Sequence, residues 1–473
     1  MKRTLTLATR NLLRNRRRSL TTLMAVIIGT ISILMFGGYV RNIIYGLESQ
    51  FVTQSGHLQI QHKDYFLYGD GNPAAYGVAD YQGMIDTIKA DRVLAPLLAV
   101  VTPMLQVGGV AGNFAAGLSR TVIGSGMVVA DQNQLRLWND YNFPQVLTPL
   151  ALDGTSTDSA VIGTGVARVL QLCQPLKVEN CPGVSAAPAA APVSAVSAVP
   201  PDAQAPDDIA ALSEQERAPV VSSGEVRIEL LAPTPRGAPN VAQLKVVKAE
   251  EQGVKELDDI FIALHLSQAQ RLVYGSGTPK VTAIIVQLKH TTDIPLAHAR
   301  LNELLAGPYK DKLLTVLTFD QINPFFGQTI KMFDVIFGFI SVLIGVIVLF
   351  MLGNTMSMTV AERTVEIGTL RAIGLRRNGI RNLFVAEGLL LGTLGVLIAI
   401  GVSILVSLLI NQSGFTWIPP GRMTKVPLTV RVLGEYRLML GSAVGLMLVS
   451  ALSAWWPARH AARMNIVDAL RHV

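Results

Sequence analysis

The chain of 473 residues has few charged and few aromatic side chains: 15% of its residues are Asp, Glu, Lys or Arg, and 6% are Phe, Trp or Tyr. Four long runs contain no Asp, Glu, Lys, Arg or His, and they cover residues 19–40, 335–360, 388–421 and 438–458. Each run can supply the roughly 20 apolar residues that a helix needs to cross a bilayer. The sequence therefore predicts a membrane protein with four transmembrane helices, one near the start and three in the last third.

The chain also lacks the residues that would let it power transport by itself. Ion-coupled carriers need ionisable side chains at membrane depth, and the four runs contain none. The sequence has no G-x-x-x-x-G-K-[ST] loop, whose backbone amides and lysine hold nucleotide phosphates. No Ser, His and Asp stand in the nucleophile-elbow context of a hydrolase. We therefore expect a protein that is not an enzyme, with no catalytic residue and no cofactor of its own.

Cysteine is scarce, with only Cys173 and Cys181 in the whole chain. Both fall in the long polar stretch between the first two apolar runs. In an oxidising compartment, two cysteines so close in sequence predict a small disulfide loop. No metal site is expected, because His57 and His62 are an odd number of residues apart on a predicted strand and so face opposite sides of it.

The net charge of +7 is distributed unevenly. Residues 46–330 hold 19 Lys or Arg against 27 Asp or Glu, a net charge of −8, and the rest of the chain has a net charge of +15. The basic excess lies in residues 2–18, in 361–387 and after residue 458. Because Lys and Arg gather in loops that stay in the cytoplasm, both termini and the 361–387 loop are expected to be cytoplasmic. The basic clusters would then set the topology and meet anionic membrane lipid, so no nucleic-acid partner is expected.

These patterns predict the order of segments along the chain. The first run is longer than the apolar part of a cleaved signal peptide, so we expect it to be retained as an anchor. The segments are a cytoplasmic amphipathic helix (1–18), the first transmembrane segment (19–45), a periplasmic domain (46–330), the second transmembrane segment (331–360), a cytoplasmic loop (361–387), the third transmembrane segment (388–411), a periplasmic loop (412–437), the fourth transmembrane segment (438–458) and a cytoplasmic tail (459–473).

The predicted periplasmic domain has a mixed α/β pattern. Alternating apolar residues predict strands at 57–61, 225–231, 244–248, 281–288 and 313–319. Helical periodicity predicts helices at 84–98, 266–273 and 295–305. Between residues 182 and 221 the chain is rich in Ala and Pro, a composition that cannot bury enough apolar surface to fold. We expect a flexible insertion there, dividing the domain into two lobes, 46–181 and 222–330.

The loop over residues 361–387 has its own helical pattern. Apolar residues three apart predict one face of a short helix, formed by Ile367, Leu370 and Ile373. Charged residues that can pair over one turn predict the opposite face, formed by Glu362, Arg363 and Glu366. Gly374 is a natural helix end. Such a helix, facing the cytosol, suits the attachment of a separate motor protein; the alternative is a basic loop that only sets topology.

The sequence around this loop resembles the FtsX-like ABC permease domain. The matching stretches are 354–374 (NTMSMTVAERTVEIGTLRAIG), 384–392 (FVAEGLLLG) and 457–470 (PARHAARMNIVDAL). The predicted periplasmic domain is similar to the one shared by LolC/LolE lipoprotein-releasing permeases and MacB-type exporters, through 55–60 (SGHLQI), 161–170 (VIGTGVARVL), 256–262 (ELDDIFI) and 270–272 (QRL). The resemblance covers most of the chain and is weakest over 171–223.

The resemblance implies a permease dimer, formed with a second copy or a paralogue, on two cytosolic ABC ATPases that bind ATP and magnesium. Residues 362–374 would be the coupling helix that contacts the ATPase, with Glu362, Arg363, Glu366, Ile367, Leu370, Arg371, Ile373 and Gly374 as its site residues. Residues 41–52 and 322–334 would extend the first two transmembrane helices as a stalk. MacB-type chains carry their own ATPase, so here a separate ATPase subunit is expected.

Three hypotheses for function follow, and none identifies the substrate-binding residues. The leading one is an inner-membrane ABC permease that extracts or exports a lipoprotein or another amphiphilic substrate, with a periplasmic carrier as partner. The second keeps the fold but exports a peptide, toxin or antibiotic through a periplasmic adaptor. The third is a non-transporting regulator that transmits mechanical force to cell-wall hydrolases.

Overall fold

The computed structural model describes residues 16–69, 72–143, 149–178, 181, 225–418 and 425–465. Most of the predicted amphipathic helix (1–18), the predicted insertion (182–221) and the end of the predicted tail (459–473) lie outside the described residues. The chain divides into two compact units. The helical unit takes the chain up to residue 48 and from residue 324 onward, apart from 418–424, and the α/β unit takes residues 49–323.

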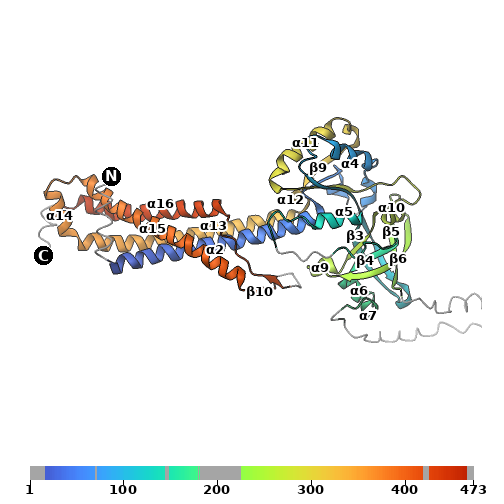
Figure 1. Cartoon of the computed structure of the whole chain (residues 1–473), viewed down its shortest axis with the longest axis horizontal. Helices are drawn as coiled ribbons and strands as arrows, with labels where there is room; N and C mark the ends of the chain where they lie inside the picture. Colours follow the sequence, from blue (N-terminus) through green and yellow to red (C-terminus); the bar gives the residue numbers. More distant parts are fainter. Residues whose placement is uncertain are drawn as a thin grey trace, which may run out of the picture. The chain divides into compact units, whose positions relative to one another are not determined.

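Four long helices dominate the helical unit: α2 (Arg16–Ser55), α13 (Pro324–Glu362), α15 (Arg377–Gln412) and α16 (Tyr436–Arg463) (Figure 1). All four are long and apolar enough to cross a membrane. The predicted fold class, with one such helix before a large α/β domain and three after it, is confirmed. Helices α2, α13 and α16 extend beyond their uncharged runs at both ends into polar residues, whereas α15 begins before its run and ends at Gln412, inside it.

Small residues let α15 and α16 pack closely. A Cβ atom added to Gly388 would lie 2.5 Å from Cβ of Ala454, and one added to Gly392 would lie 2.6 Å from Oγ of Ser450. Gly388 and Gly392 are four residues apart, so they lie on one face of α15. Close approach through small residues is a common way for helices to associate in membranes.

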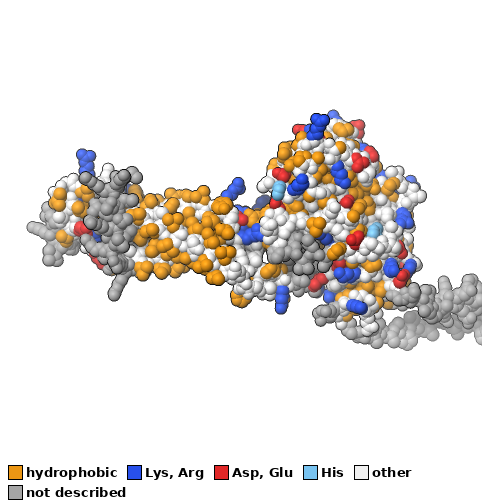
Figure 2. All heavy atoms as spheres, viewed as in Figure 1, with side chains coloured by type: hydrophobic (Ala, Val, Ile, Leu, Met, Phe, Trp, Pro, Cys, Tyr) orange, Lys and Arg blue, Asp and Glu red, His pale blue; other side chains and the backbone are white. Residues whose placement is uncertain are grey.

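The outward surface of these helices is apolar. Figure 2 shows hydrophobic side chains covering most of the visible face of the long helices. On α13 alone, exposed large apolar residues include Val335, Phe339, Val342, Ile347 and Phe350. So many exposed apolar side chains suit a surface that meets lipid or another apolar partner.

The α/β unit is built on one sheet of nine strands. Its order is β3-β7-β4-β6-β5-β2-β8-β1-β9. The strands are β1 (Leu58–His62), β2 (Leu98–Asn113), β3 (Leu118–Met127), β4 (Ser159–Gly163), β5 (Arg227–Pro233), β6 (Pro239–Glu250), β7 (Phe261–His265), β8 (Ala283–Leu288) and β9 (Leu314–Thr318). The pairs β3–β7 and β4–β6 are parallel, and the other pairs are antiparallel.

This topology corrects the expected division into lobes 46–181 and 222–330. Strand β2 lies between β5 and β8, and β4 lies between β7 and β6, so the two halves of the sequence alternate across the sheet. Buried residues from both halves, such as Leu105 and Ile284, belong to one apolar cluster. The physical reason is that strand pairing over a long sequence distance, which periodicity cannot detect, joins the halves into one core.

Short helices and turns connect the strands. They are α3 (Tyr65–Tyr68), α4 (Tyr81–Ala90), α5 (Val129–Arg136), α6 (Thr164–Val169), α7 (Cys173–Leu176), α9 (Lys255–Asp258), α10 (Leu266–Tyr274), α11 (Ile294–Ala306) and α12 (Phe319–Ile322). The helix predicted at 84–98 ends at Ala90. Its end coincides with Asp91, whose Oδ1 accepts hydrogen bonds from the amides of Val93 and Leu94 and closes a turn before β2.

Two cross-links stabilise the region around α6. The carboxylate of Asp258, which is 1% exposed, accepts hydrogen bonds from the amides of Thr164 and Gly165 at 3.0 and 3.1 Å and from the Thr164 hydroxyl. A carboxylate at this position satisfies the free amides at the start of α6. Cys173 and Cys181 are joined by a disulfide with a Cα–Cα distance of 6.2 Å.

His57 is a buried histidine next to β1. The amide of Leu288 donates to its Nδ1 at 3.0 Å, which leaves the ring proton on Nε2, 3.4 Å from the hydroxyl of Thr291. The ring of Trp138 packs edge-on against it at 4.9 Å between centroids. Burial lowers the pKa of His57 to about 3, and Asp140 only partly offsets this effect.

We predict that the α/β unit loses stability as the pH falls from 7 to 5. The unfolded chain would protonate His57 near its ordinary pKa of 6.5, whereas the folded chain would not until about pH 3. The free energy of unfolding should therefore fall by about 2 kcal/mol by pH 5. Hydrogen exchange of β8, corrected for the intrinsic exchange rate, measures this change.

His57→Gln should flatten that part of the pH profile, since the titrating group is gone. His290→Gln is the matched control. Asp140 raises the pKa of the exposed His290, so this residue stabilises the fold at low pH and the loss of stability on acidification should become steeper without it. An unchanged profile in His57→Gln would show that His57 does not cause the acid sensitivity.

Candidate functional site

The segment between α13 and α15 forms a short helix, α14 (Thr364–Ala372). Gly374 ends it with φ +105°, a backbone conformation that favours glycine. The amide of Gly374 donates to the carbonyl of Arg371 and the amide of Leu375 to that of Leu370, both at 3.0 Å. These two bonds define a Schellman motif, which satisfies the last carbonyls of the helix. We call α14, with the adjoining ends of α13, α15 and α16, the helical junction (Figure 1).

A buried ion pair fixes the helical junction internally. Nη1 of Arg363, at the start of α14, lies 3.0 Å from Oε1 of Glu387 on α15, and their side chains are 7% and 3% exposed. Nε of Arg363 also contacts Oε2 of Glu366 at 2.9 Å. The guanidinium carbon lies 5.3 Å from the centroid of the Phe384 ring. Buried charges are costly unless they are paired and hydrogen-bonded, so these contacts restrict α14 to one position against α15.

An apolar cluster surrounds this ion pair. Its buried members are Val360, Ile367, Ile380, Phe384, Ala458, Ala461 and Ala462, with Leu370 and Val385 packed against them. Three of them are alanines of α16, whose small side chains let this helix approach α14 and α15. A guanidinium nitrogen of Arg371 donates a hydrogen bond to the carbonyl of Met464, just past the end of α16. The helical junction is therefore a packed unit made from four helices.

The outer face of the helical junction is exposed and partly apolar. Val365, Thr369 and Ile373 follow at intervals of four and so form one stripe along α14. Ile373 is 80% exposed and Val365 is 45% exposed. Polar and charged side chains exposed around this stripe are Glu362, Arg376 and Arg377. We call these residues the outer face; a large exposed apolar side chain rimmed by charges is typical of a protein contact.

The structure divides the site residues that were predicted from the sequence. Arg363 and Ile367 are buried in the helical junction, and Leu370 is partly buried there. Glu362 and Ile373 are exposed. Ile373 does not share a buried face with Ile367, because six residues along a helix correspond to a rotation of about 240°, which turns Ile373 to the side of Val365 and Thr369. Arg363 was expected on the polar face but is buried.

Glu387 was not among the site residues predicted from the sequence, although it pairs with Arg363 in the helical junction. The sequence feature that could have indicated this residue is a single carboxylate directly before an apolar run, where an unpaired charge would be costly.

Cys173 and Cys181 belong to the α/β unit and take no part in the helical junction. Among the described residues, no group of three His, Cys, Asp or Glu side chains is placed to hold a metal ion.

Comparison with known proteins identifies this part of the chain. Residues 338–466 match the family model described as FtsX-like permease C-terminal. An uncharacterized ABC transporter permease from Methanocaldococcus jannaschii is 27% identical over 236 residues, which are 48% of this chain and 55% of that protein. The macrolide export ATP-binding/permease protein MacB of Campylobacter jejuni is 26% identical over 46% of this chain and 32% of its own length. The MacB protein of Escherichia coli is 28% identical over 41% of this chain and 28% of its own length.

A solved structure of the periplasmic region of MacB from Actinobacillus actinomycetemcomitans aligns with 59% of this chain and 95% of that one, at 13% identity and a TM-score of 0.31. Residues 338–466 therefore resemble an FtsX-like permease domain, and similar proteins are named MacB and ABC transporter permease. The matched region spans about half, or less, of the length of these curated relatives.

We predict that Glu387→Gln destabilises the helical unit by about 3 kcal/mol, because it removes the more buried of the two carboxylates that pair with Arg363 and leaves only the partly exposed Glu366. The double variant Arg363→Met/Glu387→Leu removes both charges and should recover most of that loss. Thermal unfolding of the purified protein in detergent measures both changes. Lys331→Gln, which removes an exposed charge from α13, is the control and should change the stability by less than about 0.5 kcal/mol. Equal losses in the single and double variants would contradict the prediction.

Proposed function

We propose that this chain is the permease subunit of an ABC transporter, that its helical junction receives a separate cytosolic ABC ATPase, and that ATP-driven motion is passed on to the α/β unit. The observation that carries the proposal is the exposed outer face of α14, supported from beneath by the buried Arg363–Glu387 pair. It stands within an FtsX-like permease domain, residues 338–466. A helix that is packed on one side and exposed on the other suits a contact that must transmit force.

The distribution of charge supports a topology for this proposal. The basic clusters lie at the N-terminus, in 361–387 and after residue 458, and the α/β unit lies in the acidic stretch. By the positive-inside rule, the helical junction faces the cytoplasm and the α/β unit the periplasm of a bacterial inner membrane. ATP and Mg²⁺ would then be bound by the ATPase and not by this chain.

The continuity of helix α2 supports transmission between the two units. It is one helix over Arg16–Ser55, so the backbone passes from the helical unit into the α/β unit without a break. The return path is α13, which begins at Pro324, directly after the α/β unit. Residues 41–52 and 322–334 would form the stalk, and α13 supplies the second segment from Pro324 onward. A second permease copy or paralogue would complete the dimer.

We propose a lipoprotein or another amphiphilic molecule as the substrate. Helix α3 of the α/β unit exposes three consecutive large apolar side chains, Phe66, Leu67 and Tyr68, at 42%, 71% and 65%. Exposed apolar patches on a folded domain indicate contact with apolar ligands or partners. The relatives named for macrolide export favour a second candidate, export of a small amphiphilic compound or peptide through a periplasmic adaptor.

The outer face provides a test of ATPase attachment. Val365→Ser/Ile373→Ser should weaken binding of the ABC ATPase that co-purifies with this chain by about tenfold or more, because truncating anchors at the centre of an interface costs over 1 kcal/mol each. The affinity and the ATPase rate are measured in nanodiscs. Leu296→Ser on α11, which is 55% exposed, is the matched control and should change neither. Wild-type affinity in the double variant would rule out the outer face as the attachment site.

Substrate class is tested with the purified permease–ATPase complex in nanodiscs. A lipidated protein loaded into the nanodiscs should be released when ATP is added and retained with a non-hydrolysable analogue. The same protein without its lipid is the control and should show no dependence on ATP. Absence of release would refute the lipoprotein substrate, and ATP-dependent movement of a macrolide or peptide in the same complex would favour the second candidate.

A further inference from the structure

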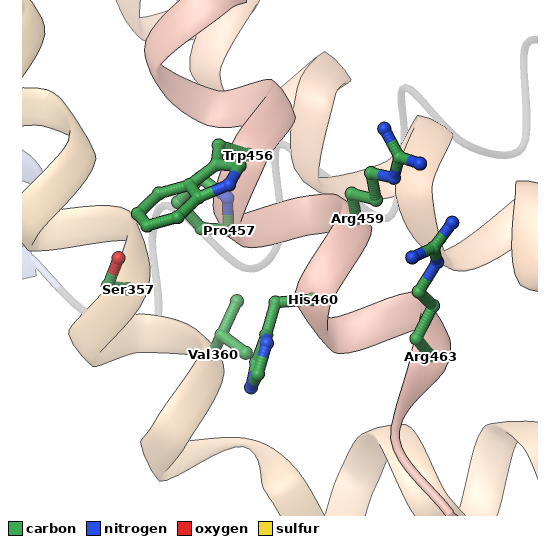
Figure 3. Close-up of a pocket in the computed structure, with 7 residues that line it drawn as sticks. All are labelled: Ser357, Val360, Trp456, Pro457, Arg459, His460 and Arg463. Carbon is green, nitrogen blue, oxygen red and sulfur yellow. The ribbon is translucent and has the colours of Figure 1, made fainter.

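A pocket lies between α13 and α16, next to the helical junction (Figure 3). Its volume is about 480 Å³. It is lined by Ser357 and Val360 of α13 and by Trp456, Pro457, Arg459, His460 and Arg463 of α16. Figure 3 shows Trp456 and His460 on the side of α16 that faces α13, and Arg459 and Arg463 extending next to each other one turn apart. The pocket combines an apolar wall with a basic edge.

The sequence places this pocket at the depth of lipid headgroups. The uncharged run of α13 ends at Val360, and that of α16 ends at Ala458, with Arg459 next. Both runs therefore end at the pocket, which straddles the boundary between hydrocarbon and headgroups. Trp456 is 77% exposed, and tryptophan is enriched at this boundary because its ring is apolar and its N–H is polar.

The charge of the pocket is of one sign. Arg459, His460 and Arg463 are all exposed, and the lining contains no carboxylate. Over the described part of the chain, no ion pair is formed by Arg459 or Arg463; Arg459 instead lies over the ring of Trp455, 5.4 Å from its centroid. Two guanidinium groups one turn apart place two positive charges and several N–H donors where a phosphate can reach both.

We propose that this pocket binds the headgroup of an anionic phospholipid. The phosphate lies between Arg459 and Arg463, and the upper part of an acyl chain lies along Trp456 and Pro457. The hydroxyl of Ser357, about one turn deeper in α13 than Val360, donates to the carbonyl of Gly353 at 2.8 Å, so it leaves no unpaired donor against the acyl chain. A basic pocket between membrane helices is a recognised arrangement for anionic headgroups.

The position of Val360 links this lipid site to the helical junction. Val360 lines the pocket and is also a buried member of the apolar cluster that holds Ile367 and Phe384. An occupied pocket would therefore stabilise the packing beneath α14. The site requires only that α13 and α16 be embedded in a membrane, so a result that refutes ATPase attachment would not refute the lipid site.

The full-length protein is placed in nanodiscs that contain equal amounts of phosphatidylglycerol and phosphatidylcholine. Native mass spectrometry then measures which lipid stays bound to it. The wild type should retain phosphatidylglycerol in preference to phosphatidylcholine. Arg459→Gln/Arg463→Gln should lower that preference by about tenfold or more, and Arg459→Lys/Arg463→Lys should keep most of it because the charge remains. Arg437→Gln removes an exposed arginine from the opposite end of α16 and should leave it unchanged.

Two further measurements keep the proposal open to refutation if the double Gln variant does not fold. A photoactivatable phosphatidylglycerol should label the wild-type peptide that contains residues 456–463, and labelling confined to other peptides would overturn the proposal. Inorganic phosphate at millimolar concentration should not displace the lipid; efficient displacement would mean a site for a soluble anion. Equal retention of both lipids by the wild type would also overturn it.

Discussion

A buried ion pair between Arg363 and Glu387 fixes where α14 packs against α15 in the helical unit. In a low-dielectric interior neither charge is tolerated alone, and together they hold the start of α14 against α15. The apolar cluster of Val360, Ile367 and Phe384 closes around the pair, and the alanines of α16 complete the packing. The amphipathic loop thereby becomes a supported helix with a defined outer face, which is the property that the proposed attachment of an ATPase requires.

The α/β unit obtains its rigidity in a different way. A single sheet joins strands from distant parts of the sequence, and the buried carboxylate of Asp258 ties the end of α9 to the start of α6. One apolar core runs beneath most of the sheet. A unit built in this manner can accept force as a whole, because no boundary between lobes divides it. This property agrees with the proposed role in passing on motion, and the exposed side chains of α3 are the surface on which the proposed substrate contact rests.

Local sequence patterns predicted the positions of helices and strands better than they predicted which strands pair and which side chains meet. The alternation at 57–61 and 281–288 corresponds to β1 and β8, and the helical periodicity at 266–273 corresponds to α10. The helix predicted at 84–98 was too long, because the carboxylate of Asp91 closes a turn that no apolar period reveals. The interleaving of strands and the burial of Arg363 could not be predicted, since both depend on residues that are distant in sequence.

The membrane character, the order of one apolar helix, a large domain and three more helices, and the place of the short helix between α13 and α15 could be predicted without a structure. These features follow from the length of apolar runs and from helical period, which are properties of neighbouring residues. The folded chain was needed to show which side chains of that helix are buried, that Glu387 neutralises Arg363, and that Ser357 and Arg463 line one pocket. These features depend on contacts between helices that are far apart in the sequence.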